Sequence, residues 1–335
     1  MLALGARLFG PTTRFVLRRL LQALLTVLVA SFLSFIVIQL APGDYLDSLR
    51  ENPQLKEYVQ VLEQKYRLDR PWLEQYFIWL WRIVRYGDLG DSFLFKRSVT
   101  SLLWERVPAT LLLALASLVL TWAIAVPLGI YSAVNQNTWG DRILRVLSYI
   151  GQGFPSFITA LLLLIAAQFL SPLLPVGDMT SIDFADLSGL GKILDLSWHL
   201  ILPTIALSIA SFAGLQRITR GQMLEVMRQD YIRTARAKGL PEGQVIYRHA
   251  LRNAINPLIT LLGFEFASLL SGAFIAEVFF NWPGLGNLTL KAVFAQDLYL
   301  VMASLLMGAV MLIVGNLLAD VLLSIADPRI DLGRE

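Results

Sequence analysis

The sequence predicts an all-α integral membrane protein with six transmembrane helices. Of its 335 residues, 56% are hydrophobic and 16% are charged, and the mean hydropathy is +0.61. Soluble domains of this size are less apolar. The second observation is a set of six apolar runs separated by polar segments, since about 20 helical residues cross a bilayer core of about 30 Å. Cysteine is absent, which excludes disulfides and thiolate sites.

The histidine content and the net charge argue against metal, cofactor and nucleic acid binding. The two histidines, His199 and His249, lie far apart in the sequence, so we expect no metal site and no cofactor bound by this chain. The formal net charge is only +3, and we expect no nucleic acid partner.

The first transmembrane helix is predicted over residues 20–40. The preceding segment 1–19 contains four arginines (Arg7, Arg14, Arg18 and Arg19) and no acidic residue. The apolar core of a signal peptide is about 7–15 residues long, and this uncharged run is longer. We therefore interpret it as an uncleaved helix.

The segment 41–108 is predicted to be external and helical. It contains ten basic and ten acidic residues. Helices are expected over Pro53–Leu68 and Pro71–Tyr86, because proline suits the first helical turn. The second of these is dense in aromatic residues, namely Trp72, Tyr76, Phe77, Trp79 and Trp81. Aromatic residues beside charge are typical of a membrane interface, but also of a small packed subdomain, and both interpretations stay open.

Five more apolar runs form the predicted core of the protein, residues 109–325. Transmembrane helices are expected over 109–133, 146–170, 200–217, 258–280 and 299–323, followed by a C-terminal segment at 326–335. Pro127 and Pro155 lie inside the second and third helices. They should kink these helices, because each removes a backbone hydrogen bond.

The distribution of Lys and Arg predicts that both termini are cytoplasmic. The segment 216–257, which includes the predicted cytoplasmic loop 218–257, contains eight basic residues. The loops 171–199 and 281–298 contain one lysine each. Cytoplasmic loops are enriched in Lys and Arg, so the loop 218–257 is placed in the cytoplasm.

The loop 218–257 is predicted to form two helices joined by a tight turn. Apolar residues at helical spacing predict one helix over Met223–Lys238. Gly239 follows at a place where a helix C-terminus favours a left-handed residue. Pro241 begins a second helix that runs to about Ala254.

Small residues in this loop predict a surface that a partner can approach. Ala235 and Gly239 are four residues apart and share a helix face. Arg233 and Arg236 flank them and could pair with acids of a partner protein. The alternative is a basic loop held by anionic lipid headgroups, and the residues alone leave both possibilities open.

The run Asp230-Tyr-Ile-Arg-Thr-Ala-Arg-Ala-Lys-Gly239 and the later His249-Ala-Leu-Arg-Asn-Ala254 resemble the cytoplasmic coupling loop, or EAA loop, of ABC importer permeases. They look like the version found in the dipeptide and oligopeptide subfamily. The sequence departs from the general motif at Arg233, which replaces glutamate, and at Thr234, which replaces alanine. The resemblance implies that ATPase coupling involves Arg233, Thr234, Ala235, Arg236, Lys238, Gly239 and Leu240.

Further landmarks of the same subfamily follow in the same order along the chain. They are Arg18-Arg19-Leu20, Ala41-Pro-Gly-Asp44, Tyr86-Gly-Asp-Leu-Gly-Asp-Ser92, Trp282-Pro-Gly-Leu-Gly286 and Asp327-Pro-Arg-Ile330. The resemblance implies a type I ABC importer permease fold in a bacterial inner membrane. It also implies the first, B-type, of two non-identical permeases, with a second permease, two cytoplasmic ATPase subunits, an external substrate-binding protein and a peptide substrate.

ATP hydrolysis is expected in the partner subunits, which would bind ATP and Mg²⁺. An ATPase needs a Gly-x-x-x-x-Gly-Lys-Ser/Thr loop to hold phosphates. The nearest string here, Gly189-Leu-Gly-Lys192, lacks the earlier glycine and is followed by Ile193. We therefore expect no catalytic residue in this chain.

Two acidic residues in the fifth predicted helix are candidates for the translocation pathway, because ionisable groups in membrane spans are costly. Glu265 lies about two turns inside the helix. It is either a buried structural carboxyl or a pathway anion that meets a cationic group such as a peptide amino terminus. Glu277 lies near the outer end, where we expect it to reach water. Gln39 and Asp320 are not assigned a substrate role.

Other functions remain as alternatives to peptide import. Nickel chelates and glutathione are substrates of the same family. A gradient-driven secondary transporter would predict clusters of ionisable groups and inverted repeats, and the sequence shows only sparse charges in the spans. A membrane scaffold would work without ATPase partners.

Overall fold

The computed structural model describes residues 11–40, 43, 45–171 and 173–326, and the side chains of 11–20, 48 and 318–326 are not described. Within this part the chain is helical, and its only strand-like feature is an isolated bridge between Asp91 and Ser98. The expected all-α class is confirmed. The chain divides into two compact units, Met1–Ala109 with Pro283–Ile313, and Thr110–Trp282 with Val314–Glu335.

The first unit is built from α1 (Pro11–Leu40), α2 (Asp47–Arg50), α3 (Lys56–Tyr66), α4 (Trp72–Tyr86), the start of α5 (Val99–Val134), α13 (Leu285–Phe294) and the first part of α14 (Leu298–Ala326). The helices expected over 53–68 and 71–86 are confirmed as α3, with the short 3-10 turn Pro53–Leu55 before it, and α4. The core of this unit contains the buried aromatic residues Phe35, Tyr76, Trp79, Phe93 and Tyr299.

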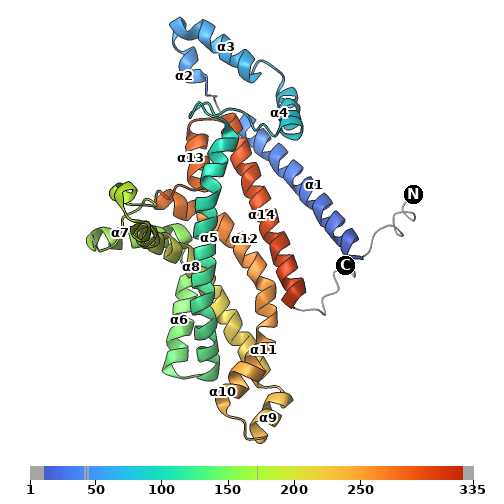
Figure 1. The fold of residues 1–335 in the computed structure, drawn as a ribbon, viewed down its shortest axis with the longest axis vertical. Coiled ribbons are helices and arrows are strands. Elements are labelled where there is room, and N and C mark those ends of the chain that lie inside the picture. The colour runs from blue at the N-terminus through green and yellow to red at the C-terminus, as the bar shows by residue number, and fades with distance from the viewer. Residues whose placement is uncertain (1–10, 41–42, 44, 172, 327–335) are drawn as a thin grey trace. The chain divides into compact units, whose positions relative to one another are not determined.

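The second unit contains the rest of α5 and α14, together with α6 (Trp139–Gly153), α7 (Ser156–Phe169), α8 (Gly189–Met227), α9 (Asp230–Ala237), α10 (Glu242–Gln244), α11 (Leu251–Ala254) and α12 (Asn256–Phe279) (Figure 1). A π-helical segment, Val245–Ala250, joins α10 to α11. The 39-residue helix α8 packs against α6, α7 and α12. It is therefore the central helix of this unit.

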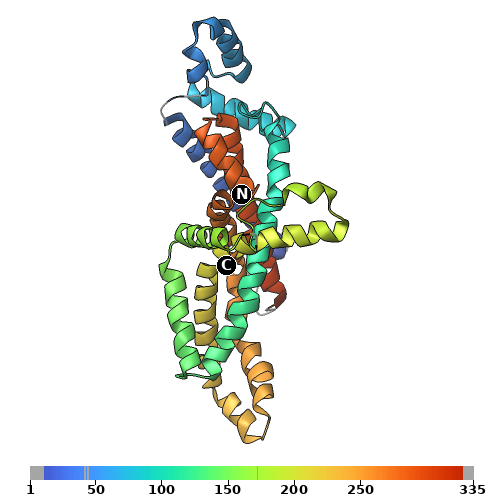
Figure 2. The same cartoon turned by 90° about the vertical axis from the view of Figure 1, so that its left-hand side faces the viewer.

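Five described helices are long and apolar enough to cross a membrane, and the total is six if α6 and α7 count as one broken span. The prediction of a single helix over 146–170 is wrong. This segment is split into α6 and α7, which meet at a bend of 106° (Figure 2). Phe154 and Pro155 are extended at the break, because a residue before proline is pushed out of the helical region. Pro155 therefore breaks the helix instead of kinking it.

Two further helix boundaries differ from the expectation. The helix expected over 200–217 is the middle of α8, since hydropathy detects the apolar part of a helix and not its polar ends. The single helix expected over Met223–Lys238 is wrong: α8 ends at Met227, Gln229 is extended, and α9 begins at Asp230. The second loop helix is confirmed over 242–254.

Several sequence landmarks lie outside the described residues. They are Arg7, Ala41-Pro42, Asp44 and Asp327-Pro-Arg-Ile330. The side chains of Arg14, Arg18, Arg19 and Asp320 are likewise outside the described part.

Candidate functional site

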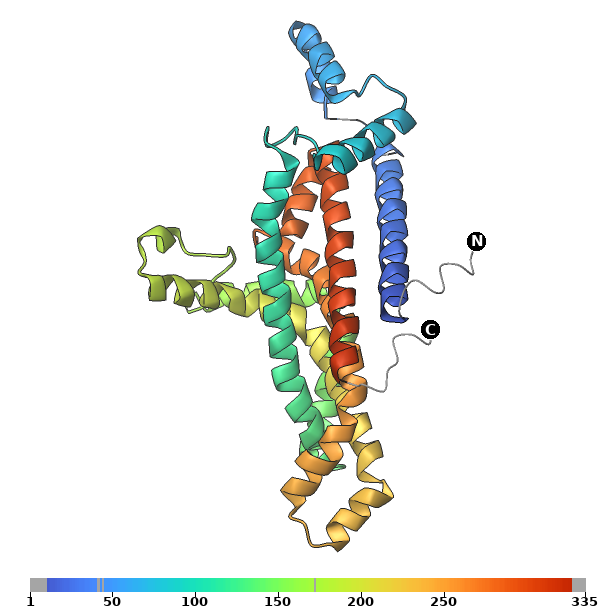
Figure 3. The ribbon, with the colours of Figure 1, turned by 45° about the vertical axis from the view of Figure 1, so that its right-hand side comes forward.

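The loop between α8 and α12 is a helical hairpin, and the views in Figures 1 and 3 both show α9 and the α10–α11 helix as its two arms. Gly239 makes the turn with φ of +74°, a conformation that costs other L-residues about 1–2 kcal/mol. The Gly239 amide donates to the Arg236 carbonyl (2.9 Å) and the Leu240 amide to the Ala235 carbonyl (3.4 Å). This is the Schellman pattern of a helix C-terminus, so the predicted role of Gly239 is confirmed.

A buried apolar cluster, which we call the loop core, fixes this hairpin to the transmembrane helices. It consists of Ile130 and Ala133 of α5, Met223 of α8, Ile232 and Ala235 of α9, and Val245, Ile246, Ala250 and Ala254 of the other arm. Met223, Ile232 and Val245 are fully buried. Side chains packed at this density transmit displacement, since interiors have low compressibility. The hairpin is therefore packed as one body with the ends of α5 and α8.

The structure separates the two small residues that were expected to share a docking face. Ala235 is only 7% exposed and points into the loop core, so its small size is explained by packing within the chain. Gly239 is exposed, and a Cβ at this position would meet nothing within 4 Å. The prediction that Ala235 and Gly239 share an exposed face is therefore wrong, because Ala235 is turned inward.

The exposed surface of the hairpin is polar and basic. Arg233, Thr234, Arg236 and Lys238 are exposed, while Leu240 is half-buried at the edge of the loop core. We call these four exposed residues the basic rim. The Arg233 guanidinium lies 3.3 Å from Asp230, and both side chains are largely in solvent. Lys238 forms no ion pair within the described residues, so its charge is available to a partner.

Arg236 is tied to the second arm of the hairpin. Its guanidinium donates to Glu242 across the turn, with a shortest distance of 2.6 Å. This hydrogen bond lowers the pKa of the Glu242 carboxyl and raises the pKa of Arg236. The pair braces the Gly239 turn from its solvent side, and Arg236 is accordingly less free than Lys238 to bind a partner.

Sequence reasoning missed Asp141, which joins three parts of the second unit. The carboxyl is fully buried and accepts hydrogen bonds from Arg220 Nε of α8 (2.7 Å), from the Asn137 amide (2.9 Å) and from Ser132 Oγ of α5. Arg145 lies 3.5 Å from it. Asp141 is the lone acid in a segment otherwise marked by Arg142 and Arg145, which was the available signal. Its partner Arg220 is 79 residues away.

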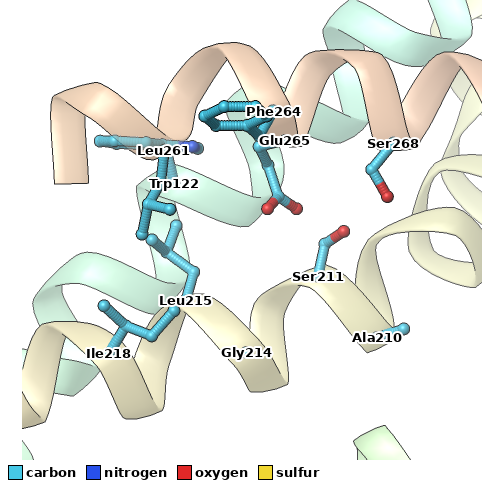
Figure 4. Close-up of a pocket in the computed structure, with 10 residues that line it drawn as sticks. All are labelled: Trp122, Ala210, Ser211, Gly214, Leu215, Ile218, Leu261, Phe264, Glu265 and Ser268. Carbon is cyan, nitrogen blue, oxygen red and sulfur yellow. The ribbon is translucent and has the colours of Figure 1, made fainter. Parts of the chain in front are cut away.

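A cavity of about 370 Å³ lies between α5, α8 and α12 in the same unit. It is lined by Trp122 of α5, by Ala210, Ser211, Gly214, Leu215 and Ile218 of α8, and by Leu261, Phe264, Glu265 and Ser268 of α12. Figure 4 shows the Glu265 carboxyl pointing from α12 towards α8, with the Ser211 and Ser268 hydroxyls in the same space. The volume is in the range of small-molecule pockets.

Two polar atoms of this cavity are buried without a hydrogen-bond partner among the described residues. They are Oε1 of Glu265, an acceptor when the carboxyl is ionised, and Nε1 of Trp122, a donor. Buried polar atoms are normally paired, because leaving one unpaired costs about 1–3 kcal/mol. Both residues line the cavity, and each has one unpaired polar atom, an acceptor and a donor, that is closed off from solvent in this conformation.

The other acidic residue of α12 has a structural contact. Glu277 is fully buried, and its carboxyl accepts a hydrogen bond from Thr110 Oγ1 at 2.5 Å. The expectation that Glu277 reaches water is therefore wrong, because α5 covers it. Gln39 lies in the first unit and donates to Gln75 at 3.3 Å.

The glycine motif Tyr86–Ser92 has a packing role in the first unit. Gly90 has φ of +99°, and Ser92 Oγ donates to Asp297 at 2.6 Å. The Asp297 carboxyl also accepts from the Leu94 amide (3.0 Å) and the Leu300 amide (3.3 Å). Burial raises the pKa of Asp297 above its ordinary value, and the hydrogen bonds offset only part of that rise. The motif thus fixes the segment before α5 to the start of α14.

The comparisons with known proteins agree along almost the whole chain. Residues 125–332 match the family model described as the binding-protein-dependent transport system inner membrane component, and residues 12–114 match the N-terminal model of the same systems. The chain is 38% identical over 320 residues to the oligopeptide transport system permease protein AppB of Bacillus subtilis, covering 95% of this chain and 99% of that protein.

A second relative and a solved structure extend this result. The oligopeptide transport system permease protein OppB of Haemophilus influenzae is 35% identical over 319 residues, covering 95% of this chain and 99% of that protein. A structure of the inward-facing MetNI methionine ABC transporter matches with a TM-score of 0.55 and 16% identity over 68% of this chain and 97% of that chain, which shows the fold alone. This protein is therefore a member of the binding-protein-dependent transport system inner membrane component family, a multi-pass transport permease with the type I ABC importer permease fold.

Proposed function

We propose that this chain is one of two permease subunits of an ATP-driven peptide importer and forms half of its translocation pathway. The peptide substrate is supported by the relatives named as oligopeptide permeases. The observation that carries the mechanism is the continuity of α8, which lines the Glu265 cavity at Ser211 and Ile218 and enters the loop core at Met223. A movement of the loop core is a movement of one cavity wall.

In this proposal the partner subunits supply the energy. Two cytoplasmic ATPases bind ATP and Mg²⁺ and contact the basic rim, with both termini of this chain also in the cytoplasm of a bacterium. Closure of the ATPase dimer displaces the hairpin, and the buried Asp141–Arg220 pair transmits the displacement from α8 to the α5–α6 turn. Such coupling requires that the ATPases contact the two states of the permease differently.

We also propose that Glu265 receives the free amino terminus of the peptide. A peptide amino terminus carries an ammonium group and, one residue away, a carbonyl oxygen. The unpaired Glu265 Oε1 accepts from the ammonium, and the unpaired Trp122 Nε1 donates to the carbonyl. The two serines on the facing helices add neutral hydrogen-bonding groups for the peptide backbone.

Reconstitution of the complex in proteoliposomes tests the function. The second permease, the ATPases and an external binding protein are added, and uptake of labelled peptides is followed with and without ATP. Uptake that requires both ATP and the binding protein is expected. Uptake driven by an ion gradient without ATP would contradict the proposal, and exclusive uptake of a nickel chelate or glutathione would contradict the peptide substrate.

A further inference from the structure

The helix α4 presents three different faces in the first unit. One face is packed inward: Tyr76 and Trp79 are 4% and 2% exposed, and Trp79 Nε1 donates to the Leu89 carbonyl at 3.1 Å. A narrow second face is polar and contains Glu74 and Arg85, which are exposed. It adjoins the third face, since Glu74 is three residues before Phe77 and Arg85 is four residues after Trp81. The inward face is therefore already covered by the core of this unit.

The third face is an apolar stripe that is largely exposed. It consists of Leu73, Phe77, Trp81 and Val84, spaced by four, four and three residues, which places them in one row along a helix. Phe77 is 61% exposed, Trp81 63% and Val84 75%. Contiguous exposed apolar rows of this kind mark an interaction surface.

Contacts with α1 set the depth of α4 in the membrane. Tyr76 OH lies 2.9 Å from Ser31 Oγ and 3.4 Å from the Leu28 carbonyl. The span of α1 covers Leu21–Leu40, and twelve residues separate Leu28 from its end, about 18 Å along the helix. Even allowing for the length of the tyrosine side chain, α4 lies beside the final part of this span and not beyond it.

The rest of the α1 contacts agree with this depth. The Phe35 ring is stacked 6.3 Å from Trp72, and Gln39 donates to Gln75. At the same level α1 turns Leu33, Val37 and Leu40 outward with 54%, 67% and 79% exposure, a surface that a spanning helix gives to lipid. Figure 3 shows α4 lying across the Leu40 end of α1, the orientation of a helix in the plane of the interface.

We propose that the stripe of Leu73, Phe77, Trp81 and Val84 is embedded in the headgroup and acyl boundary of the lipid bilayer, at the membrane face where α1 ends. An amphipathic helix whose apolar row is bordered by charged residues binds an interface in this way. Trp suits this depth because its ring is amphipathic. The partner of this face is lipid, and the claim does not depend on the transported substrate.

The test uses spin labels at single cysteines, for which the cysteine-free chain is a clean background. Phe77→Cys and Trp81→Cys report on the stripe, and Glu57→Cys and Gln60→Cys, exposed positions of α3 in the same unit, are the controls. The assembled complex is placed in phosphatidylcholine vesicles. Collision with oxygen, which concentrates in lipid, is compared with collision with a water-soluble nickel chelate.

We expect the ratio of oxygen to nickel accessibility to be several-fold higher at positions 77 and 81 than at 57 and 60. Val84→Cys provides a further stripe position if either of the first two variants fails to assemble. Equal nickel accessibility at stripe and control positions would place the stripe in water and overturn the proposal. Protection of the stripe from both reagents would also overturn it, by showing that a protein covers this face.

Discussion

The loop core and the Glu265 cavity share helix α8 but differ in how their polar and apolar groups are satisfied. In the loop, Ile232 and Ala235 are buried among apolar neighbours, and Arg236 is paired with Glu242. In the cavity, Glu265 Oε1 and Trp122 Nε1 have no partner within the described residues. Dense packing suits a segment that transmits movement. Unpaired polar groups suit a segment that binds a substrate.

The largest expected effect comes from breaking the buried Asp141–Arg220 pair, which holds α8 near the loop core. Asp141→Ala leaves Arg220 without its carboxylate in a site where the side chain is only 16% exposed. Removing one partner of a buried pair costs about 3–5 kcal/mol. We expect loss of assembled complex, measured as the yield and melting temperature of the purified complex. Asp230→Ala, which removes an exposed pair, is the control and should melt within a few degrees of the unmodified complex.

The next effect tests the cavity side of the comparison. Glu265→Gln removes the charge but keeps the shape, and a charge-assisted hydrogen bond is worth about 1.5–3 kcal/mol. We expect about tenfold weaker uptake of peptides with a free amino terminus, with no loss of complex stability. N-acetylated peptides should be transported equally by both proteins. An equal loss for both peptide types would show that Glu265 is structural.

A third variant tests whether the loop core is closed. Ala235→Leu adds three carbon atoms to a position that is 7% exposed, and overpacking costs about 1–3 kcal/mol. We expect ATP hydrolysis that no longer responds to the substrate-loaded binding protein. Ala237→Leu, the same substitution at an exposed position of α9 outside the basic rim, is the control and should keep this response. A normal response of ATP hydrolysis in the Ala235→Leu variant would contradict this, by showing that the loop core accommodates the larger side chain.

The smallest effect is the pH dependence of the hairpin turn. The folded pKa of Glu242 is lowered by Arg236, so its contribution is fully present above the ordinary carboxyl pKa of 4.5. It is lost as the pH falls through the lower folded pKa. Both side chains are substantially exposed, so the pair is worth about 0.2–1 kcal/mol. Hydrogen exchange at the Leu240 amide, corrected for intrinsic rates, should be unchanged from pH 7 to 5. The Glu242→Gln variant, which lacks the ion pair, should exchange this amide faster.

The apolar stretches of the spans and the Gly239 turn could be predicted from the sequence, because each depends on local chemistry, whereas the break at Pro155 was predicted only as a kink. An apolar run of sufficient length specifies a membrane helix, and a glycine before Pro241 specifies the turn. The break between Met227 and Asp230 could not be predicted in this way, since Arg228 and Gln229 carry no breaking signal.

The candidate site was predicted less completely than the fold. Helical periodicity showed that Ala235 lies on a face but not whether that face is inside or outside, and packing against α5 and α8 decides this. The Asp141–Arg220 pair and the Glu277–Thr110 hydrogen bond join residues 79 and 167 positions apart. Only the fold brings such residues together. Glu265 was singled out because a carboxyl inside a span is rare; the structure places it in the cavity wall, and its role in translocation stays a prediction.

The most direct test of the account is capture of the ATPases by a permease complex with a reversed basic rim. Arg233→Glu and Lys238→Glu are introduced together and leave the loop core intact. Lys56→Glu and Arg70→Glu, two exposed positions of the external segment, give a control with the same change in net charge. The account predicts that the ATPases no longer co-purify with the first variant but do co-purify with the control. Normal ATPase capture by the reversed rim would contradict the assignment of this loop as the coupling surface.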